Sequence, residues 1–329
     1  MFSTKLLRWF RKAKRPLPWR TEPRDPYRTW ISEVMLQQTR VDVVIPYYQR
    51  FLNRFPTLQS LARAPLDDVL ALWSGLGYYR RARNLHKAAR AAQNGLPATA
   101  HELRALPGFG PYTAAAVASL AHNEDVALVD GNVARVLARV FRLEGDARAK
   151  SWRIAEELLP RGHAGEFNEA LMELGATVCT PRAPNCTNCT IRMSCLGRDT
   201  PERFPEPKKR PDRPLLEWKA VALRRRDGAI LLARRPPDSL FAGMWDLPMS
   251  DPGARLPKWP GVRVRGRLED RGVVAQTLTH REVRVAIRAG HASGAPKTDS
   301  LKWVAPNDLH QLGLSSLARK SLRKAGIAC

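Results

Sequence analysis

Four of the five cysteines of this 329-residue chain lie in one short segment, TVCTPRAPNCTNCTIRMSC. They follow the pattern C-x6-C-x2-C-x5-C, and they are Cys179, Cys186, Cys189 and Cys195. The N-terminus has neither an uninterrupted apolar segment nor a small-residue cleavage site, so we expect no secretory signal. In such a chain a cysteine cluster indicates a metal centre rather than disulfides. The fold must therefore bring this segment back on itself around one centre.

The spacing of the four cysteines favours an iron–sulfur cluster and leaves zinc open. Zinc ribbons usually have two C-x2-C pairs, and this loop has one. A compact loop with unequal spacings suits the separated corners of a [4Fe–4S] cluster. Disulfides are the least favoured alternative. Arg182 and Arg192 lie inside the loop and are candidate phosphate contacts. The remaining cysteine, Cys329, is the last residue and receives no assignment.

The charge of the chain indicates a polyanionic partner. It has 55 Lys+Arg and 31 Asp+Glu, which gives a formal net charge of +24, and both halves have an excess of basic residues. An apolar fraction of 44% is enough to bury a core, which excludes wholesale disorder. The sequence has no run of about 18 apolar residues, so we expect no membrane span. Nucleic acid is favoured over an anionic membrane surface.

The chain changes character near its middle. Residues 1–197 show apolar residues at helical spacing and predict an all-α domain. Residues 198–214, rich in proline and charge, predict a solvated linker. Residues 215–329 predict an α+β domain on an antiparallel or mixed sheet. Its strands are expected at 219–235, around an Asp-Gly turn, and at 261–270, 274–280 and 281–290, before a closing helix over 315–326.

A glycine-rich turn joins two helical stretches at about 101–121. The turn reads Leu106-Pro107-Gly108-Phe109-Gly110 and is followed by Pro111, a favourable first residue of a helix. Gly108 and Gly110 free the backbone, so that the turn amides and the helix N-terminus form an anion site. Such a hairpin grips DNA phosphate without reading sequence. An ordinary helix–helix turn is the competing interpretation.

A second motif, Val129-Asp130-Gly131-Asn132-Val133, stands just before an apolar-periodic helix. Asp and Asn both cap helices well, so capping alone explains Asp130 if the motif is taken by itself.

The hairpin, the VDGN step and the four-cysteine loop occur in the order typical of the endonuclease III-like DNA glycosylases. Within this superfamily the chain resembles the MutY-type adenine DNA glycosylases. Two stretches carry this closer resemblance, WISEVMLQQTRVDVVIPYYQRF and LWSGLGYYRRARNLHKAA. The resemblance runs from about residue 17 to residue 195 and continues more weakly through LLARRPPDSLFAGMWDLP. It implies a helix-hairpin-helix domain, a [4Fe–4S] cofactor and removal of adenine mispaired with 8-oxoguanine or guanine in double-stranded DNA.

The resemblance also implies roles for two carboxylates. Glu33 lies in the apolar helical context ISEVML, where burial would raise its pKa, and it would protonate N7 of adenine. Asp130 would stabilise the oxocarbenium-like sugar, as a second carboxylate does in glycoside hydrolysis. Asn132 would help to position these groups. Without the resemblance, a lone Glu on a helix is most simply a solvated residue.

Tyr112 occupies the position at which bifunctional lyases of this superfamily carry a nucleophilic lysine, two residues after the last hairpin glycine. A tyrosine cannot form a Schiff base, so we expect a monofunctional glycosylase. Tyr112 would instead lie over the sugar and support the intermediate.

Other residues are assigned to DNA and base contacts through the resemblance. Base extraction needs side chains that fill the gap in the stack. Gln37 and Gln38 would contact the strand, and Tyr78 would insert beside the 8-oxoguanine. Arg20 and Glu169 are weaker assignments to the adenine pocket. Ordinary surface polar residues and a core aromatic are the alternatives.

The C-terminal region resembles the Nudix-like domain that reads 8-oxoguanine in this family. The glutamate-rich Nudix signature is absent from the sequence, which disfavours a pyrophosphohydrolase. Leu278-Thr279-His280 stands where the family usually has Phe-Ser-His. Thr279 retains a hydroxyl that could contact the lesion, whereas Leu278 lacks the ring. His280 is a candidate contact or, alternatively, a plain strand histidine.

Two further rivals remain. A glycosylase for thymine or uracil is disfavoured because such relatives usually lack the long second domain. A non-catalytic damage sensor would need neither Glu33 nor Asp130. We expect a monomeric, cytoplasmic protein that binds double-stranded DNA and no membrane.

Overall fold

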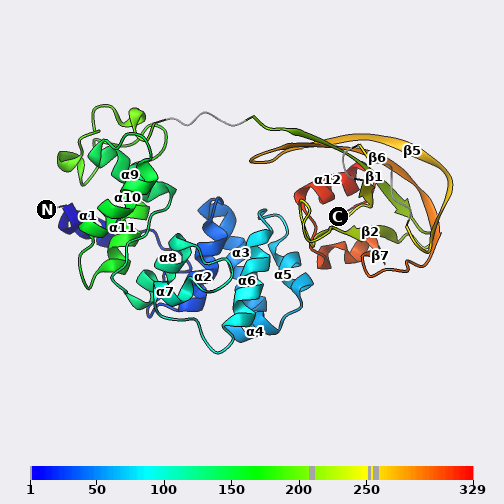
Figure 1. Cartoon of the computed structure of the whole chain (residues 1–329), viewed down its shortest axis with the longest axis horizontal. Coiled ribbons are helices and arrows are strands. Elements are labelled where there is room, and N and C mark those ends of the chain that lie inside the picture. The colour runs from blue at the N-terminus through cyan, green and yellow to red at the C-terminus, as the bar shows by residue number, and fades with distance from the viewer. Residues whose placement is uncertain (1, 207–211, 251–252, 255–258, 329) are drawn as a thin grey trace. The chain divides into compact units, whose positions relative to one another are not determined.

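The computed structural model of the chain describes residues 2–206, 212–250, 253–254 and 259–328. The chain divides into two compact units, Met1–Ala62 with Lys87–Lys209 and Arg63–His86 with Arg210–Cys329. Figure 1 shows helices along the N-terminal part of the chain and the sheet in its C-terminal part. The predicted fold class, an all-α region followed by an α+β region, is confirmed. Cys329 lies outside the described residues.

The N-terminal region, residues 2–206, contains helices and no strand among its described residues. None of the described helices is both long and apolar enough to cross a membrane. Two short 3-10 helices follow the last α-helix, at Arg192–Ser194 and Pro201–Arg203. The α-helices are α1 (Phe2–Ala13), α2 (Pro26–Leu36), α3 (Val41–Arg54), α4 (Leu58–Arg63), α5 (Leu66–Trp73), α6 (Arg80–Ala91), α7 (Ala100–Leu103), α8 (Pro111–His122), α9 (Gly131–Phe141), α10 (Ala147–Leu158) and α11 (Ala164–Thr177).

The core of the first unit is built around α11, which packs against α1, α8 and α9. Helix α9 buries Val133, Val136, Leu137 and Val140, the apolar residues that recur at helical spacing. Because α8 and α9 both pack on α11, the residues at their N-terminal ends are brought close to it. This packing positions the candidate site.

The predicted hairpin is confirmed as the turn between α7 and α8. Gly108 has a φ of +83°, a left-handed conformation that glycine adopts without strain. Gly110 is the N-cap of α8 and Pro111 begins the helix. Between them Phe109 turns inward and its ring stacks on Trp30 of α2, with the ring centroids 5.2 Å apart. The turn is thus anchored by one aromatic side chain, while both glycines are exposed.

The first part of the predicted linker is packed rather than solvated. Phe204 is 6% exposed and contacts Ala138 and Ala147. The Arg139 side chain donates to the carbonyl oxygens of Pro201 and Phe204 at 2.8 and 3.0 Å. Residues 207–211 of the predicted linker lie outside the described residues. The proposed boundaries at 197 and 215 stay a prediction.

The C-terminal region forms one mixed sheet in the order β3-β2-β1-β6-β5, with β4 paired to β1 and β7 paired to β2. Strands β1 and β6 run parallel, and the other pairs are antiparallel. Helix α12 packs against β5 and β6 over the buried core (Figure 1). The elements are β1 (Leu215–Arg224), β2 (Ile230–Arg234), β3 (Trp245–Asp246), β4 (Met249–Ser250), β5 (Val262–Thr277), β6 (Glu282–Gly294), β7 (Leu301–Val304), a 3-10 helix (Pro306–Gln311) and α12 (Ser316–Lys324).

The predicted hairpin at Asp227-Gly228 and the closing helix are confirmed, and one detail of the strands was wrong. The stretches expected as two strands over 261–270 and 274–280 form the single strand β5. Its pairing with β6 has register shifts between Arg265 and Glu269 and between Asp270 and Gly272. These bulges break the alternation, which is why the sequence pattern looked like two elements. His280 lies in the turn after β5, not in a strand.

Candidate active site and four-cysteine loop

Glu33 is buried on α2, with 4% of its surface exposed. Burial, reinforced by the carboxylates of Asp130 and Glu169, raises the pKa of Glu33 to about 7, while a hydrogen bond from Tyr112 and the charge of Arg20 act to lower it. The predicted burial and the upward direction of the pKa are confirmed. With a pKa of about 7, the carboxyl group is protonated in roughly half of the molecules at neutral pH, and a general acid must be protonated to act.

Tyr112 lies in the first turn of α8 and its hydroxyl donates to Oε2 of Glu33 at 2.5 Å. Burial and the neighbouring carboxylates of Glu33 and Asp130 raise the pKa of Tyr112 well above its usual range. The phenol therefore stays protonated and remains a donor. The family resemblance predicts that Tyr112 lies over the sugar. Its hydrogen bond gives it a further task, because it orients the carboxyl group of Glu33 directly.

Asp130 is the N-cap of α9 and accepts from the Val133 amide at 2.7 Å through Oδ1. Its other oxygen, Oδ2, accepts from Nδ2 of Asn132 at 2.9 Å. Burial raises the pKa of Asp130, and these hydrogen bonds partly offset that rise. Capping therefore accounts for one oxygen only. The cap also fixes the carboxylate near Glu33, whose pKa it helps to raise.

Arg135 connects the Asp130–Asn132 pair to the cysteine loop, and sequence reasoning missed it. Its Nη2 donates to Oδ1 of Asn132 at 2.8 Å and to the carbonyl of Gly175 at 2.7 Å. Its Nε donates to the carbonyl of Cys179 at 2.8 Å. One guanidinium thus holds the start of α9, the end of α11 and the first cysteine in one arrangement.

Gly175 lies where α11 approaches the start of α9. A Cβ at this position would stand 2.6 Å from Cβ of Asn132, so an alanine must push the two helices apart. We expect Gly175→Ala to lower the single-turnover rate of base release about 10- to 100-fold, because small displacements of reacting groups are costly.

The matched control for Gly175→Ala is Gly165→Ala on the same helix. There a Cβ would stand 2.5 Å from the carbonyl oxygen of Ser119, away from Asn132. Both variants should unfold at lower temperature, but only Gly175→Ala should lose release per folded molecule. Equal losses in the two variants would contradict a local effect on Asn132.

Arg20 and Glu169 form a buried ion pair beside Glu33. Nε of Arg20 lies 3.1 Å from Oε1 of Glu169, and the two side chains are 10% and 9% exposed. Oε2 of Glu169 accepts from Nη2 of Arg24 at 2.6 Å. The structure brings both predicted residues into the site. It adds Arg24 and Glu173, which the sequence motifs did not single out.

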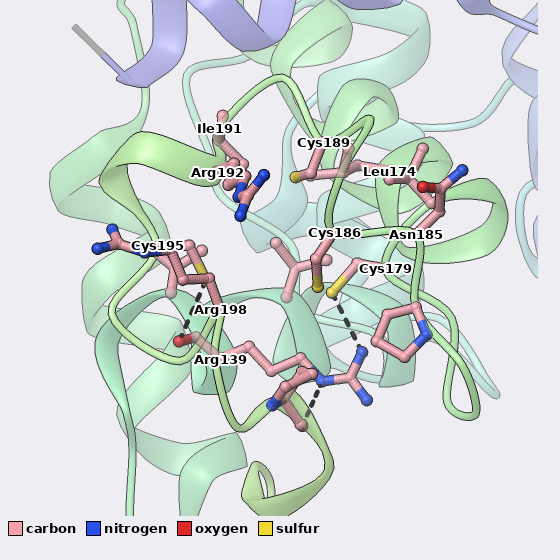
Figure 2. A pocket seen from close by; sticks show the side chains of 15 residues that line it. Arg139, Leu174, Cys179, Asn185, Cys186, Cys189, Ile191, Arg192, Cys195 and Arg198 are labelled. Atoms are coloured by element: carbon pink, nitrogen blue, oxygen red, sulfur yellow. Dashed lines mark hydrogen bonds between the residues drawn. The ribbon is translucent and has the colours of Figure 1, made fainter.

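The four predicted cysteines line one open cavity. Figure 2 shows the sulfurs of Cys179 and Cys186 beside each other, with Cys189 and Cys195 around the same space. The thiols form no disulfide. Burial raises the pKa of Cys186, Cys189 and Cys195, the second to about 11, and neighbouring thiolates add to the effect.

The donor set of this cavity fits a soft metal centre. Four thiolates repel one another and need a compensating cation, and sulfur ligands select zinc or iron–sulfur clusters. Among the residues that the structure describes, however, no group of three or more His, Cys, Asp or Glu side chains is placed so that it could hold one metal ion. Arg139 supports the loop, since its Nη1 donates to Sγ of Cys179 at 3.3 Å and to the carbonyl of Thr180 at 2.7 Å.

The predicted strand contacts Gln37 and Gln38 follow α2 directly. Nε2 of Gln37 donates to Oγ1 of Thr113 in α8 at 3.0 Å. Gln38 has a φ of +57°, which is uncommon for a residue with a side chain and typical of strained functional turns. The two glutamines therefore sit on a constrained turn between α2 and α3.

Tyr78 and Thr279 meet within the second unit. The Tyr78 hydroxyl lies 2.6 Å from Oγ1 of Thr279, and either atom could be the donor. Tyr78 is 43% exposed and has a φ of +50°. His280, beside Thr279, is exposed, and Leu278 packs against the sheet core. The hydroxyl that Thr279 retains thus has a partner that the sequence did not suggest.

Comparisons with known proteins agree with this architecture. Residues 31–161 match the HhH-GPD superfamily of base excision DNA repair proteins, and residues 219–324 match the NUDIX domain. A thermostable thymine-DNA glycosylase has the same fold over 60% of this chain and 95% of its own, with a TM-score of 0.55 and 30% identity. The helical region is therefore a base-excision glycosylase fold.

Similar proteins of known activity indicate which glycosylase family within this class the chain belongs to. The adenine DNA glycosylase of Homo sapiens is 33% identical over 98% of this chain and 73% of its own length. The adenine DNA glycosylase of Mus musculus is 34% identical over 98% of this chain and 77% of its own length. The chain belongs to the adenine DNA glycosylase family, and it is a glycosylase with a Nudix-like C-terminal domain.

Proposed function

We propose that this chain excises adenine from A:8-oxoguanine and A:G mispairs in double-stranded DNA, as a monofunctional glycosylase with Glu33 as its general acid. One observation carries the proposal. In a member of the adenine DNA glycosylase family, a buried Glu33 with a pKa of about 7 accepts a hydrogen bond from Tyr112 and stands near Asp130.

The chemistry follows from the environments of the two carboxyl groups. Adenine leaves poorly as an anion, so a proton from Glu33 to N7 lowers the barrier to cleavage of the N-glycosidic bond. Asp130, tied by the Val133 amide and by Asn132, supplies fixed negative charge to the oxocarbenium-like sugar. Tyr112 keeps the carboxyl group of Glu33 oriented. Water then adds at C1′ and leaves an abasic site.

The monofunctional assignment rests on residue 112. A phenol offers no amine for a Schiff base with the sugar aldehyde. Its hydrogen bond to Glu33 gives it a different task at the lyase position. Strand cleavage by that route is therefore absent from the proposed reaction.

The proposed DNA grip uses backbone groups and charge. Exposed Gly108 and Gly110 and the N-terminus of α8 present amides to a phosphate. Gln37 and Gln38 contact the distorted strand from their constrained turn. With a net charge of +24, non-specific binding should weaken steeply as salt rises.

Recognition of the opposite base is assigned to the second unit. Exposed Tyr78 offers a ring that can stack beside the orphaned base, and Thr279 steadies it through its hydroxyl. His280 is exposed next to them and is the further candidate contact.

The proposed cofactor is a [4Fe–4S] cluster held by the four cysteines around their common cavity. When bound, it supplies a structural centre that closes the loop and keeps Arg139 and Arg135 in place. The base-release steps use protein side chains only.

The proposal is tested by single-turnover release from duplexes carrying A:8-oxoguanine, A:G, A:T, T:G and U:G pairs. We expect adenine release from the first two pairs and strand breaks only after alkali. A known endonuclease III-type lyase serves as the positive control for breaks without alkali. Release of thymine or uracil with adenine untouched would overturn the substrate assignment, and breaks without alkali would overturn the monofunctional one.

A further inference from the structure

Glu173 is a buried carboxylate that no sequence motif marked. It lies in α11 and its side chain is 1% exposed. An ionised carboxylate at such a position is costly unless it is fully paired. The contacts of its two oxygens therefore indicate what it holds.

Two arginines use both oxygens of Glu173. Oε1 accepts from the Arg15 amide at 3.1 Å and from Nε of Arg15 at 2.7 Å. Oε2 accepts from Nη2 of Arg15 at 3.0 Å and from Nη2 of Arg20 at 2.9 Å. Burial acts to raise the pKa of Glu173, but these contacts outweigh it and hold the pKa below its usual range. The group is thus an anion at neutral pH.

Arg20 is fixed on several sides by this arrangement. Besides Glu173, its Nε donates to Glu169 at 3.1 Å and its Nη1 donates to the Arg15 carbonyl at 2.9 Å. The guanidinium also lies over the ring of Phe10, 5.3 Å from the ring centroid. Glu173 is thus one of the groups that fix Arg20, and together with Glu169 it compensates the charge of the guanidinium.

The charge of Arg20 acts on Glu33. The groups that face Glu33 are Tyr112 from α8, Asp130 at the start of α9, Glu169 from α11 and Arg20 from the segment before α2. Glu173 is not one of the groups that act on Glu33, but its Oε2 accepts from Arg20, so Arg20 links the two carboxyl groups.

We propose that Glu173 is a positioning residue for base release, which fixes and balances the Arg20 guanidinium beside Glu169 and thereby sets the pH range in which Glu33 acts as an acid. This inference rests on the proposed function. Removal of the Glu173 charge leaves Arg15 and Arg20 less compensated, and excess positive charge favours the ionised form of Glu33. Glu33 then loses its proton at a lower pH than in the wild-type protein. The decline of base release on the alkaline side should therefore begin at a lower pH.

The test is the pH dependence of single-turnover adenine release by the full-length Glu173→Gln variant on an A:8-oxoguanine duplex. We expect the alkaline limb to move down by about 0.5 to 1 pH unit, which means a roughly 3- to 10-fold slower release above the limb. The acid plateau should change by less than about two-fold. An unchanged limb, or a uniform loss at every pH, would overturn the inference.

Two variants sharpen the test. Glu166→Gln removes another ion pair between α11 and α1, with Arg11 at 2.8 Å, outside this network, and should leave the profile unchanged. Arg15→Gln removes a cation instead of an anion and should move the limb upward. Opposite shifts in the two network variants cannot come from general damage, so shifts of the same sign would overturn the inference. If Glu173→Gln does not fold, the pH profile of Arg15→Gln alone tests the inference. An alkaline limb that is unchanged or shifted to lower pH in Arg15→Gln would then overturn the inference.

Failure of the proposed function is seen separately. If Glu33→Gln still releases adenine, the acid assignment itself is wrong. If Glu33→Gln is inactive while Glu173→Gln keeps the wild-type limb, only the role of Glu173 is wrong.

Discussion

Glu33→Gln is expected to lower the single-turnover rate of adenine release by about 10²- to 10⁴-fold, the usual contribution of a general acid. The carboxyl group is buried and bonded to Tyr112, so its replacement by an amide keeps both the shape and an acceptor oxygen for the phenol. Only the transferable proton is lost. The loss should therefore appear in the chemical step and leave duplex affinity within about two-fold.

The control for this variant is Glu157→Gln in α10, an exposed residue whose carboxylate forms a surface ion pair with Arg153 at 3.7 Å. That variant should match the wild-type rate. Retention of more than about a tenth of the wild-type rate by Glu33→Gln, with normal folding, would exclude Glu33 as the acid.

If the proposed iron–sulfur cluster is bound, Cys186→Ser is expected to remove it and to destabilise the helical region. Loss of a structural metal centre is one of the mechanisms behind unusually large destabilisation, so we expect a cost of roughly 3–5 kcal/mol, at and above the top of the usual range of about 0.5–3 kcal/mol. At about 2–4 °C per kcal/mol for a region of this size, the melting temperature should fall by roughly 6 to 20 °C. Visible absorbance, acid-labile sulfide and iron content should fall together, and DNA binding should weaken as the loop opens.

Cys329→Ser is the matched control, since it changes a cysteine outside the loop. It should retain iron, sulfide and thermal stability. One equivalent of zinc in the wild-type protein, with no sulfide, would show that the four thiolates hold a different metal. A Cys186→Ser protein with full iron content would remove Cys186 from the ligand set.

Local sequence signals predicted much of the helical fold. The apolar positions of α9 repeat at helical spacing and are buried as expected, and the glycines of the α7–α8 turn stand where the backbone needs them. Periodicity works here because a helix must bury one face. It failed at β5, where two bulges interrupt the alternation within one strand.

The site was predicted less completely. Glu33 and Asp130 were singled out through the family resemblance, which the stretches around ISEVML and VDGN help to carry. Arg135, Gly175 and Glu173 were missed because their partners lie far away in the sequence. Arg135 joins Asn132 to Cys179, and Glu173 joins α11 to residues near the N-terminus. An arginine or glutamate on a helix has the same local appearance whether it is solvated or buried.

The sequence by itself determined the parts that depend on neighbouring residues: the cysteine spacing, the hairpin glycines, the N-cap Asp130 and the absence of a lysine at position 112. Only the tertiary structure decided the protonation of Glu33, because a pKa depends on burial and on charges brought together from α2, α8, α9 and α11. The same holds for the buried Arg15–Glu173–Arg20–Glu169 network. Its two arginines lie 149 to 158 residues from its two glutamates along the chain, and the packing of α1 against α11 helps to make them neighbours.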